Sequence, residues 1–372
     1  MKDAKDRPVW FPEPSQADDS RGPRGEPFTA WVGRSTLPRA RAARRFLNKN
    51  LHALPDEHQP ALYRALHDRW SSAFFELVVV RTLQVLGAKI EVEPGGAEDI
   101  RIDFAASFPD SIVSVEAMAP AFNVEVGKQV KQRNPLLDIV ESLAPSDLWV
   151  LVESLPELGP SDSKKPFKRA VEKLLGDAAG DEVSVPTELI EELPQGTLRI
   201  KVIPKSPNAS TGRSLGIEPP LTAFDDTEQR VRRAVDRKRR QGRESSAPAL
   251  LAIHATGISS SYEAFDRALF GRTVTRIGLD RRVLDTGFDA DGVFNKGAGT
   301  PTWAGVLAFV NVGLRGGPDP VLYLHPRFEG TLPDALLSLV RRTYNTEVAR
   351  IETHKSPATG ILEKIGFVPP DV

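Results

Sequence analysis

Residues 100–118 read IRIDFAASFPDSIVSVEAM, and this stretch decides the fold that we expect. The segments 100–108 and 112–118 carry apolar residues in the pattern of β-strands, including Ile102, Phe104, Val113 and Val115. The triplet Pro109-Asp110-Ser111 between the two segments is a turn signal, because proline and aspartate favour tight turns. The stretch therefore predicts a β-hairpin.

The flanking segments extend this hairpin into an α/β arrangement. Before it, the pattern predicts a long helix over residues 60–86, ended by Gly87, and a strand over residues 89–93. After it, we expect a helix over residues 128–143 and a strand over residues 148–152. The order of helix, three strands, helix and strand predicts a mixed sheet flanked by helices.

The rest of the chain contains further α/β elements. We predict a flexible leader over residues 1–30, which are rich in proline, glycine and charge. The remaining residues, 31–372, are expected to form one domain, with a core over about 60–205 and a C-terminal extension over about 206–372. In the second half we expect a loop over 204–225, a basic helix over 226–242, a strand over 249–254, a helix over 262–269, an irregular segment over 272–302, paired strands over 306–312 and 321–324, and a helix over 332–340 followed by loop.

Composition excludes several classes of site. The 372 residues are 40% hydrophobic and 27% charged, as in an ordinary globular protein, and none is cysteine. The lack of cysteine excludes disulfides, thiolate zinc sites, iron–sulfur ligation and a catalytic thiol. The net charge of −1 gives weak overall attraction to nucleic acid, so any such contact would need local basic patches.

Neither the N-terminal residues nor the apolar runs suggest a membrane. The chain begins with polar residues and lacks the apolar region of a signal peptide, and its apolar runs are too short to cross a bilayer. We therefore expect a cytoplasmic protein with no membrane partner.

Three carboxylates stand in apolar surroundings. Glu76 begins a helical stripe that continues through Val79, Val80 and Leu83, and an ionised group on such a face costs free energy unless something compensates it. Asp103 and Glu116 lie within the two apolar strands of the hairpin, against the usual strand preference. Residues that break local rules in this way often mark function.

Converging carboxylates would suit Mg²⁺ or Mn²⁺, because hard cations take oxygen ligands. Such a metal site can activate a water molecule and stabilise charge on a phosphate under attack. Two other interpretations remain open at this point: the acids face solvent on an exposed sheet, or Glu76 forms an ion pair with an arginine.

Other common sites are not supported. The six histidines do not show the spacing of a zinc site. The glycine-rich piece Gly297-Ala298-Gly299 lacks the lysine of a phosphate-binding P-loop, and no Gly-x-Ser-x-Gly motif of a serine hydrolase occurs.

Several short motifs, in their order, resemble the PD-(D/E)XK nuclease superfamily. These are Glu76-Leu77, Leu86-Gly87, Ile102-Asp103-Phe104 and Val115-Glu116-Ala117. The later part of the chain is similar to an uncharacterised bacterial branch of that superfamily, through Lys238-Arg239-Arg240, residues 248–252, Ala268-Leu269-Phe270-Gly271, Tyr323-Leu324-His325-Pro326 and Leu332-Pro333. The resemblance spans roughly residues 60–335.

The resemblance implies a fold and an activity. The fold would be a restriction-endonuclease-like core with a C-terminal α/β extension, so that residues 31–372 form one nuclease-like domain. The activity would be that of a Mg²⁺- or Mn²⁺-dependent phosphodiesterase acting on DNA. Asp103 and Glu116 would hold the metal, with Glu76 as a third ligand or as the residue that positions water.

The sequence departs from the superfamily pattern at two positions. Ile102 stands where proline usually precedes the aspartate, and Met118 stands where the lysine that orients the attacking water is expected. The catalytic lysine would then have moved to Lys128, Lys131 or Lys238, the last of which falls on an apolar stripe with Val231, Ala234 and Val235. The alternative is a catalytically silent module that binds nucleic acid or a protein partner.

The basic helix offers a candidate contact with nucleic acid. Arg233, Arg237 and Arg240 share one face at i, i+4, i+7 spacing and would follow a phosphate backbone. The alternative is a solvated helix face. DNA is thus the partner we expect, and a homodimer is left open.

Overall fold

The computed structural model describes residues 8–20, 22–93, 102–120, 124–159, 161–180, 185–206, 215–217, 226–239, 247–257, 260–277, 283–288, 291–296, 301–345, 347 and 350–367. The chain divides into two compact units. The first contains Met1–Asp19, Pro27–Ala121 and Asp225–Val372, and the second contains Ser20–Glu26 and Phe122–Phe224. No helix in the described part of the chain is long and apolar enough to cross a membrane.

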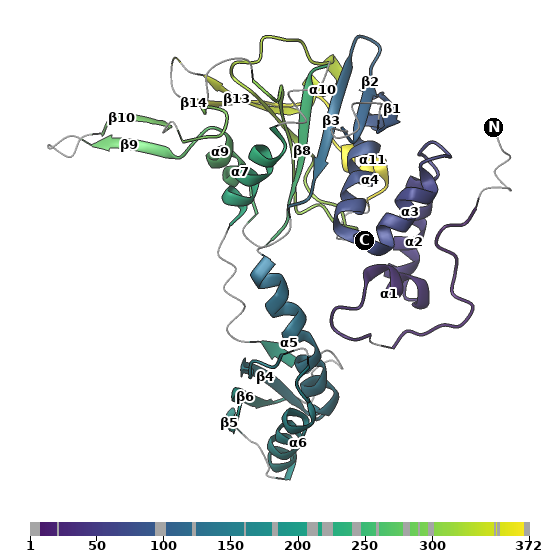
Figure 1. The fold of residues 1–372 in the computed structure, drawn as a ribbon, viewed down its shortest axis with the longest axis vertical. Helices are drawn as coiled ribbons and strands as arrows, with labels where there is room; N and C mark the ends of the chain where they lie inside the picture. The colour runs from purple at the N-terminus through teal and green to yellow at the C-terminus, as the bar shows by residue number, and fades with distance from the viewer. Residues whose placement is uncertain are drawn as a thin grey trace. The chain divides into compact units, whose positions relative to one another are not determined.

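The first unit is built on an eight-stranded mixed sheet (Figure 1). In spatial order its strands are β1 (Lys89–Val92), β2 (Phe104–Ser107), β3 (Ile112–Met118), β8 (Ala249–Ala255), β11 (Gly305–Val310), β12 (Val321–Leu324), β13 (Val340–Asn345) and β14 (Arg350–His354). The first three form an antiparallel meander, β3, β8 and β11 run parallel, and β12 returns antiparallel to β11. The predicted mixed sheet is confirmed.

The hairpin predicted from residues 100–118 is also present. Phe104 pairs with Val115, and the N–H of Phe108 donates to the carbonyl of Ser111 at 2.8 Å to close the turn. Phe104 and Val115 are buried in the same apolar core. Because side chains alternate along a strand, Glu116 is directed to the opposite face of β3.

Helices cover both faces of this sheet (Figure 1). On one face lie α4 (Trp70–Val85) and α11 (Ile361–Ile365), which pack against each other, with α4 against β3. On the other face lie α7 (Thr227–Arg237) against β8 and α9 (Tyr262–Leu269) against β11. The single helix predicted over residues 60–86 is instead two helices, α3 (Gln59–Asp68) and α4. The break at Arg69 (φ −140°, ψ 57°) lets α3 pack against α4.

The second unit has its own sheet and core. Its strands lie in the order β5 (Thr187–Leu193), β6 (Gly196–Pro204), β4 (Leu148–Ser154) and β7 (Leu215–Ile217). The helices α5 (Val124–Leu143) and α6 (Lys165–Gly180) pack with that sheet around Val150, Val152 and Phe167. This unit interrupts the chain between β3 and α7.

This insertion corrects our assignment of the core. We placed the helix over 128–143 and the strand over 148–152 next to the hairpin, but the structure places them in the second unit as α5 and β4. The helix and strand that follow the meander in the main sheet are α7 and β8, with Val115 paired to Leu250. A core over about 60–205 therefore does not match the compact units.

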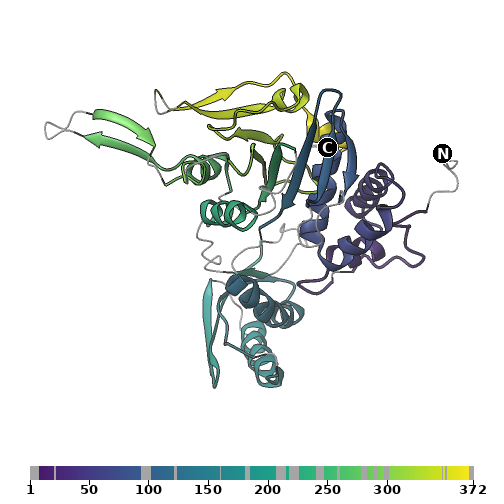
Figure 2. The same cartoon turned by 45° about the horizontal axis from the view of Figure 1, so that its top comes forward.

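Two further segments differ from the sequence prediction. The segment expected to be irregular carries a hairpin of β9 (Thr273–Ile277) and β10 (Val283–Phe288), which Figure 2 shows extending from the sheet of the first unit. The expected helix over 332–340 is reduced to α10 (Asp334–Leu337), and the expected loop after it holds β13 and β14. β13 contains Arg341 and Arg342 at positions where apolar residues would have indicated a strand.

Residues 8–19 of the predicted leader belong to the first unit, whereas Ser20–Glu26 belong to the second. Phe11 is 5% exposed and exchanges two hydrogen bonds of 2.9 Å with the side chain of Asn48 on α2 (Pro38–Leu51). Its ring contacts Tyr63 and stacks on His67 at 5.6 Å. The helix α1 (Phe28–Arg34) then joins this segment to α2. Composition did not predict this, since one buried aromatic side chain outweighs its polar surroundings.

Replacing Phe11 by alanine is expected to lower the free energy of unfolding by about 3 kcal/mol, because it removes a buried ring. Val9→Ala is the matched control: Val9 is 64% exposed, and its truncation should change stability by less than about 0.5 kcal/mol. Urea denaturation followed by circular dichroism measures both. Equal stability of the two variants would show that this segment is not anchored.

Candidate functional site

Asp103 and Glu116 meet at the open end of the β2–β3 hairpin. Asp103 directly precedes β2, and its Oδ2 accepts a hydrogen bond from the backbone N–H of Ala117 at 2.8 Å. Ala117 follows Glu116 in β3, so this bond ties the first carboxylate to the strand that carries the second. The negative charge of Asp103 acts on Glu116.

Glu116 is the most deeply buried acid of this group, with its side chain 2% exposed. Its Oε1 accepts a hydrogen bond from the Lys238 ammonium group, and the two form an ion pair. Its Oε2 is buried and has no hydrogen-bond partner in the described part of the chain. One carboxylate oxygen is thus paired with a cation, and the other is buried without a partner. A buried oxygen without a partner lowers the stability of the fold unless a further group binds it.

Lys238 reaches this position from the C-terminal end of α7. It follows Val231 and Val235, which are buried against the sheet, and it is 26% exposed. The apolar stripe explains why a lysine can point inward here: its carbon chain lies along the packed helix face while the ammonium group reaches Glu116.

Burial dominates the protonation of the three acids. It raises the pKa of Glu116 to about 7, aided by the negative charge of Asp103 and opposed by Lys238. Burial likewise raises the pKa of Asp103, against the hydrogen bond from Ala117. The pKa of Glu76 is raised by burial too, against the nearby guanidinium of Arg69. Perturbed acids grouped in this way often mark functional sites.

Glu76 is engaged by an arginine. Arg69 donates to its two carboxylate oxygens, at 2.5 Å and 3.3 Å. In the described residues, no group of three or more histidine, aspartate or glutamate side chains is placed to hold a metal ion. The structure therefore does not assemble Glu76, Asp103 and Glu116 into the three-carboxylate metal site that we expected, and it shows the arginine pair that the sequence had left open.

The three lysine candidates fall into different parts of the molecule. Lys128 and Lys131 are exposed on α5 of the second unit. Lys238 belongs to the first unit and is the candidate that contacts a site carboxylate. Met118, at the motif position of the lysine, packs against the apolar cluster that includes Val231 and Ile253.

Two residues of the site were missed from the sequence. One is Arg69. Its position seven residues before Glu76 was the signal in the sequence that the two side chains could pair. The other is Glu93, which has a positive φ of 46° and whose N–H donates to the carbonyl of Asp103 at 2.8 Å. Its negative charge also raises the pKa of Asp103 and Glu76. The turn-forming residues Pro94, Gly95 and Gly96 follow Glu93 in the sequence and were a signal for the end of β1.

Arg233 and Arg237, two of the predicted nucleic-acid contacts, are exposed on α7. Arg240 lies outside the described residues. Elsewhere on the helix, Arg230 is buried and pairs with Asp226 at 2.7 Å, and Arg232 pairs with Glu228 at 3.1 Å. The exposed arginines therefore lie on the helix that also leads to Lys238.

The raised pKa of Glu116 predicts a pH-dependent stability. Its folded pKa of about 7 lies above the usual 4.5, so the folded state holds the proton more tightly, and stability from this group falls as pH rises from about 4.5 to 7. In Glu116→Gln, which lacks the titrating carboxyl group, the free energy of unfolding should decrease less over this pH range than in wild type, by at most ~3 kcal/mol. Urea denaturation at several pH values measures the difference from wild type, with Glu329→Gln, an exposed acid, as control. Parallel pH profiles of wild type and Glu116→Gln would contradict the assignment.

The chain matches no protein-family model, no curated protein and no solved structure. Function has therefore to be inferred from the geometry around Glu116.

Proposed function

We propose that this protein is a Mg²⁺- or Mn²⁺-dependent phosphodiesterase that cleaves DNA. Asp103 and Glu116 would hold the metal ion, and Lys238 would supply the cationic group that the motif strand lacks. The observation that carries the proposal is the pairing of Lys238 with Glu116. Lys238 is distant from Glu116 in the sequence, yet the two side chains form an ion pair. The superfamily pattern places its lysine near this same carboxylate.

The order of elements around the site supports the same proposal. The first unit contains a helix, a three-stranded meander, a helix and a strand parallel to the third: α4, β1 to β3, α7 and β8. This is the core order of the PD-(D/E)XK superfamily that the motifs resemble. Glu76, Asp103 and Glu116 lie on the first helix, before the second strand and on the third strand, as the resemblance implies.

The donors present fit a hard divalent cation. The buried and unsatisfied Oε2 of Glu116 is the kind of oxygen ligand that Mg²⁺ takes, and Asp103 supplies a second carboxylate next to it. Two carboxylates are enough, because Mg²⁺ usually keeps several of its waters. When bound, the metal would lower the pKa of a water and stabilise charge on the phosphate.

The protein's own residues would then divide the remaining tasks. The hydrogen bond from Ala117 orients the carboxylate of Asp103. Lys238, released from Glu116 when a cation binds there, would place its ammonium group where negative charge grows on the phosphate. Arg233 and Arg237 are exposed on the same helix and would contact backbone phosphates.

A second candidate is a nuclease-like module without catalysis. Met118 at the lysine position favours it, and so does the ion pair that already neutralises Glu116. Such a module would bind DNA through Arg233 and Arg237 and would not require a metal.

Cleavage of plasmid and single-stranded DNA with Mg²⁺ or Mn²⁺ tests the choice between them. Wild type is compared with Asp103→Asn and Glu116→Gln, and Glu329→Gln serves as a control with the same loss of charge at an exposed site. Metal-dependent cutting that both site variants lose and the control keeps supports the phosphodiesterase. Pure wild type that cuts neither substrate with either metal, yet binds DNA in fluorescence anisotropy, supports the silent module.

A further inference from the structure

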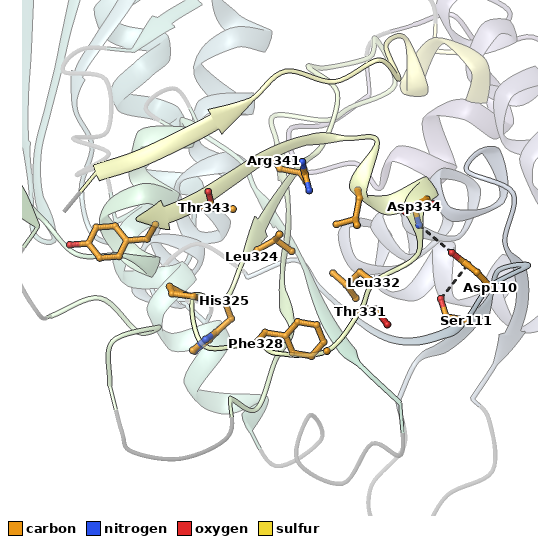
Figure 3. Close-up of a pocket in the computed structure, with 14 residues that line it drawn as sticks. Asp110, Ser111, Leu324, His325, Phe328, Thr331, Leu332, Asp334, Arg341 and Thr343 are labelled. Carbon is orange, nitrogen blue, oxygen red and sulfur yellow. Dashed lines mark hydrogen bonds between the residues drawn. The ribbon is translucent and has the colours of Figure 1, made fainter. Parts of the chain in front are cut away.

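A second site lies in the first unit, at the other end of the β2–β3 hairpin. It is a pocket of about 570 Å³, a size typical of small-molecule sites. Its wall comes from the turn after β2, the segment after β12, the helix α10 and the strand β13 (Figure 3). Asp110 and Ser111 of that turn line it, whereas Asp103 and Ala117 lie at the hairpin's opposite end. The pocket shares no residue with the candidate catalytic site.

Much of the wall is apolar. Leu324, Phe328, Leu332 and Leu337 line it, and Figure 3 shows Leu324, Leu332 and Phe328 around the same space. Gly330 leaves room for the Phe328 ring, because a Cβ on residue 330 would lie 2.5 Å from the Cζ of that ring. An apolar body of moderate size would therefore be stabilised by burial here.

Arg341 adds a positive charge to this wall. Its Nε is buried without a hydrogen-bond partner, and its guanidinium has no ion pair within the part of the chain that the structure describes. The next residue on β13, Arg342, is by contrast neutralised by Asp266. A guanidinium that is partly buried and unpaired is best satisfied by a carboxylate, which it can bind through two parallel hydrogen bonds.

Two acids limit the charge of the ligand. Asp110 and Asp334 also line the pocket, and Asp110 accepts hydrogen bonds from the N–H of Asp334 at 3.4 Å and from the hydroxyl of Ser111 at 3.3 Å. Their negative charge would repel a second anionic group on the ligand. A single carboxylate is thus favoured over a doubly charged phosphate.

We infer that this pocket binds a small organic monocarboxylate with an apolar body, whose carboxylate pairs with Arg341. The apolar part would lie against Leu324, Phe328 and Leu332. This inference is independent of the proposed phosphodiesterase activity, because it uses a different pocket and is tested by binding alone.

The test is calorimetric titration of the full chain with 3-phenylpropionate, indole-3-propionate and decanoate. Phenethylamine, which replaces the carboxylate by an amine, and phenyl phosphate, which carries a second negative charge, are the comparison probes. We expect at least one carboxylate to bind, phenethylamine not to bind, and phenyl phosphate to bind more weakly than 3-phenylpropionate. Binding of none of the three carboxylates, or tighter binding of the amine or the phosphate, would overturn the inference.

Three variants connect binding to Arg341. Arg341→Met should weaken carboxylate binding at least about tenfold, and Arg341→Lys should restore part of it because the charge is retained. Arg350→Met, at an exposed arginine on β14, should bind as wild type does. The melting temperature of Arg341→Met without ligand should not fall, since Arg341 has no ion pair to lose. Unchanged affinity in Arg341→Met together with a lower melting temperature would show a structural arginine and refute the assignment.

A further variant tests the apolar wall. Gly330→Ala would push the Phe328 ring from its position and is expected to weaken binding of the same carboxylate several-fold, while leaving Arg341 in place. Retained affinity in Gly330→Ala would place the ligand away from Phe328 and contradict the proposed orientation.

Discussion

Replacing Lys238 by methionine is expected to lower the rate of metal-dependent DNA cleavage by at least about a hundredfold. The ammonium group would stabilise charge that develops on the phosphate, and removal of one such group typically costs about 10²–10³ in rate. The same change should lower the free energy of unfolding by about 3 kcal/mol near pH 8, because Glu116 then stays buried without its ion-pair partner.

A double variant separates these two effects. In Lys238→Met combined with Glu116→Gln, no buried charge is left unpaired, so stability should return toward that of wild type while cleavage stays lost. Lys364→Met, at an exposed lysine on α11, controls for the loss of a positive charge. Urea denaturation and plasmid cleavage are measured on all four proteins. A Lys238→Met protein that cuts as fast as wild type would remove the lysine from the mechanism.

The part of the site that could be predicted came from local patterns. The alternation around the turn at Pro109 predicted the hairpin, and acids placed among apolar residues indicated Asp103, which directly precedes β2, and Glu116 in β3. The stripe of Val231 and Val235 indicated that Lys238 faces inward, and the structure shows that lysine paired with Glu116. In each instance the signal lay within about ten residues, where side-chain periodicity is directly visible.

The missed part depended on contacts between distant segments. Nothing in the sequence order shows that the chain leaves the main sheet after β3, builds α5 and β4 around a separate core, and returns through α7 to pair β8 with β3. A helix and a strand inside an insertion have the same periodicity as a helix and a strand of the core. Pairing is decided by burial and register, which only the folded chain displays.

The partner of Glu76 was left open for a similar reason. Its apolar stripe indicated a buried carboxylate that needs compensation, and a metal ion and an arginine satisfy that need equally well in a sequence. The structure shows an arginine in this place, because Arg69, at the break between the two helices, donates to Glu76. Helix patterns on both sides of residue 69 hid that break, so the arginine was not recognised as its partner.

The second large effect that we expect is a pH-dependent metal affinity. Mn²⁺ or Mg²⁺ at about a hundredfold excess over its dissociation constant should stabilise the fold by about 2.7 kcal/mol near pH 8, and Asp103→Asn should lose this stabilisation. Below pH 7 the affinity should fall about tenfold per pH unit, because the proton held by Glu116 must leave before its oxygen can bind the cation. Calorimetric titration with Mn²⁺ at about pH 6 and about pH 8 measures the difference.

Lys238 makes this prediction more specific, because its ammonium group binds Oε1 of the same Glu116 carboxylate whose Oε2 a cation would approach. In Lys238→Met the competing positive charge is gone and the pKa of Glu116 is higher, so Mn²⁺ should bind more tightly than to wild type at a pH where Glu116 is ionised in both proteins, although cleavage is lost. Glu329→Gln should keep the affinity and the pH dependence of wild type. An affinity that does not change with pH, or that Lys238→Met weakens where Glu116 is ionised, would mean that the cation binds elsewhere. The Glu116–Lys238 pair would then be an ion pair that only stabilises a silent fold.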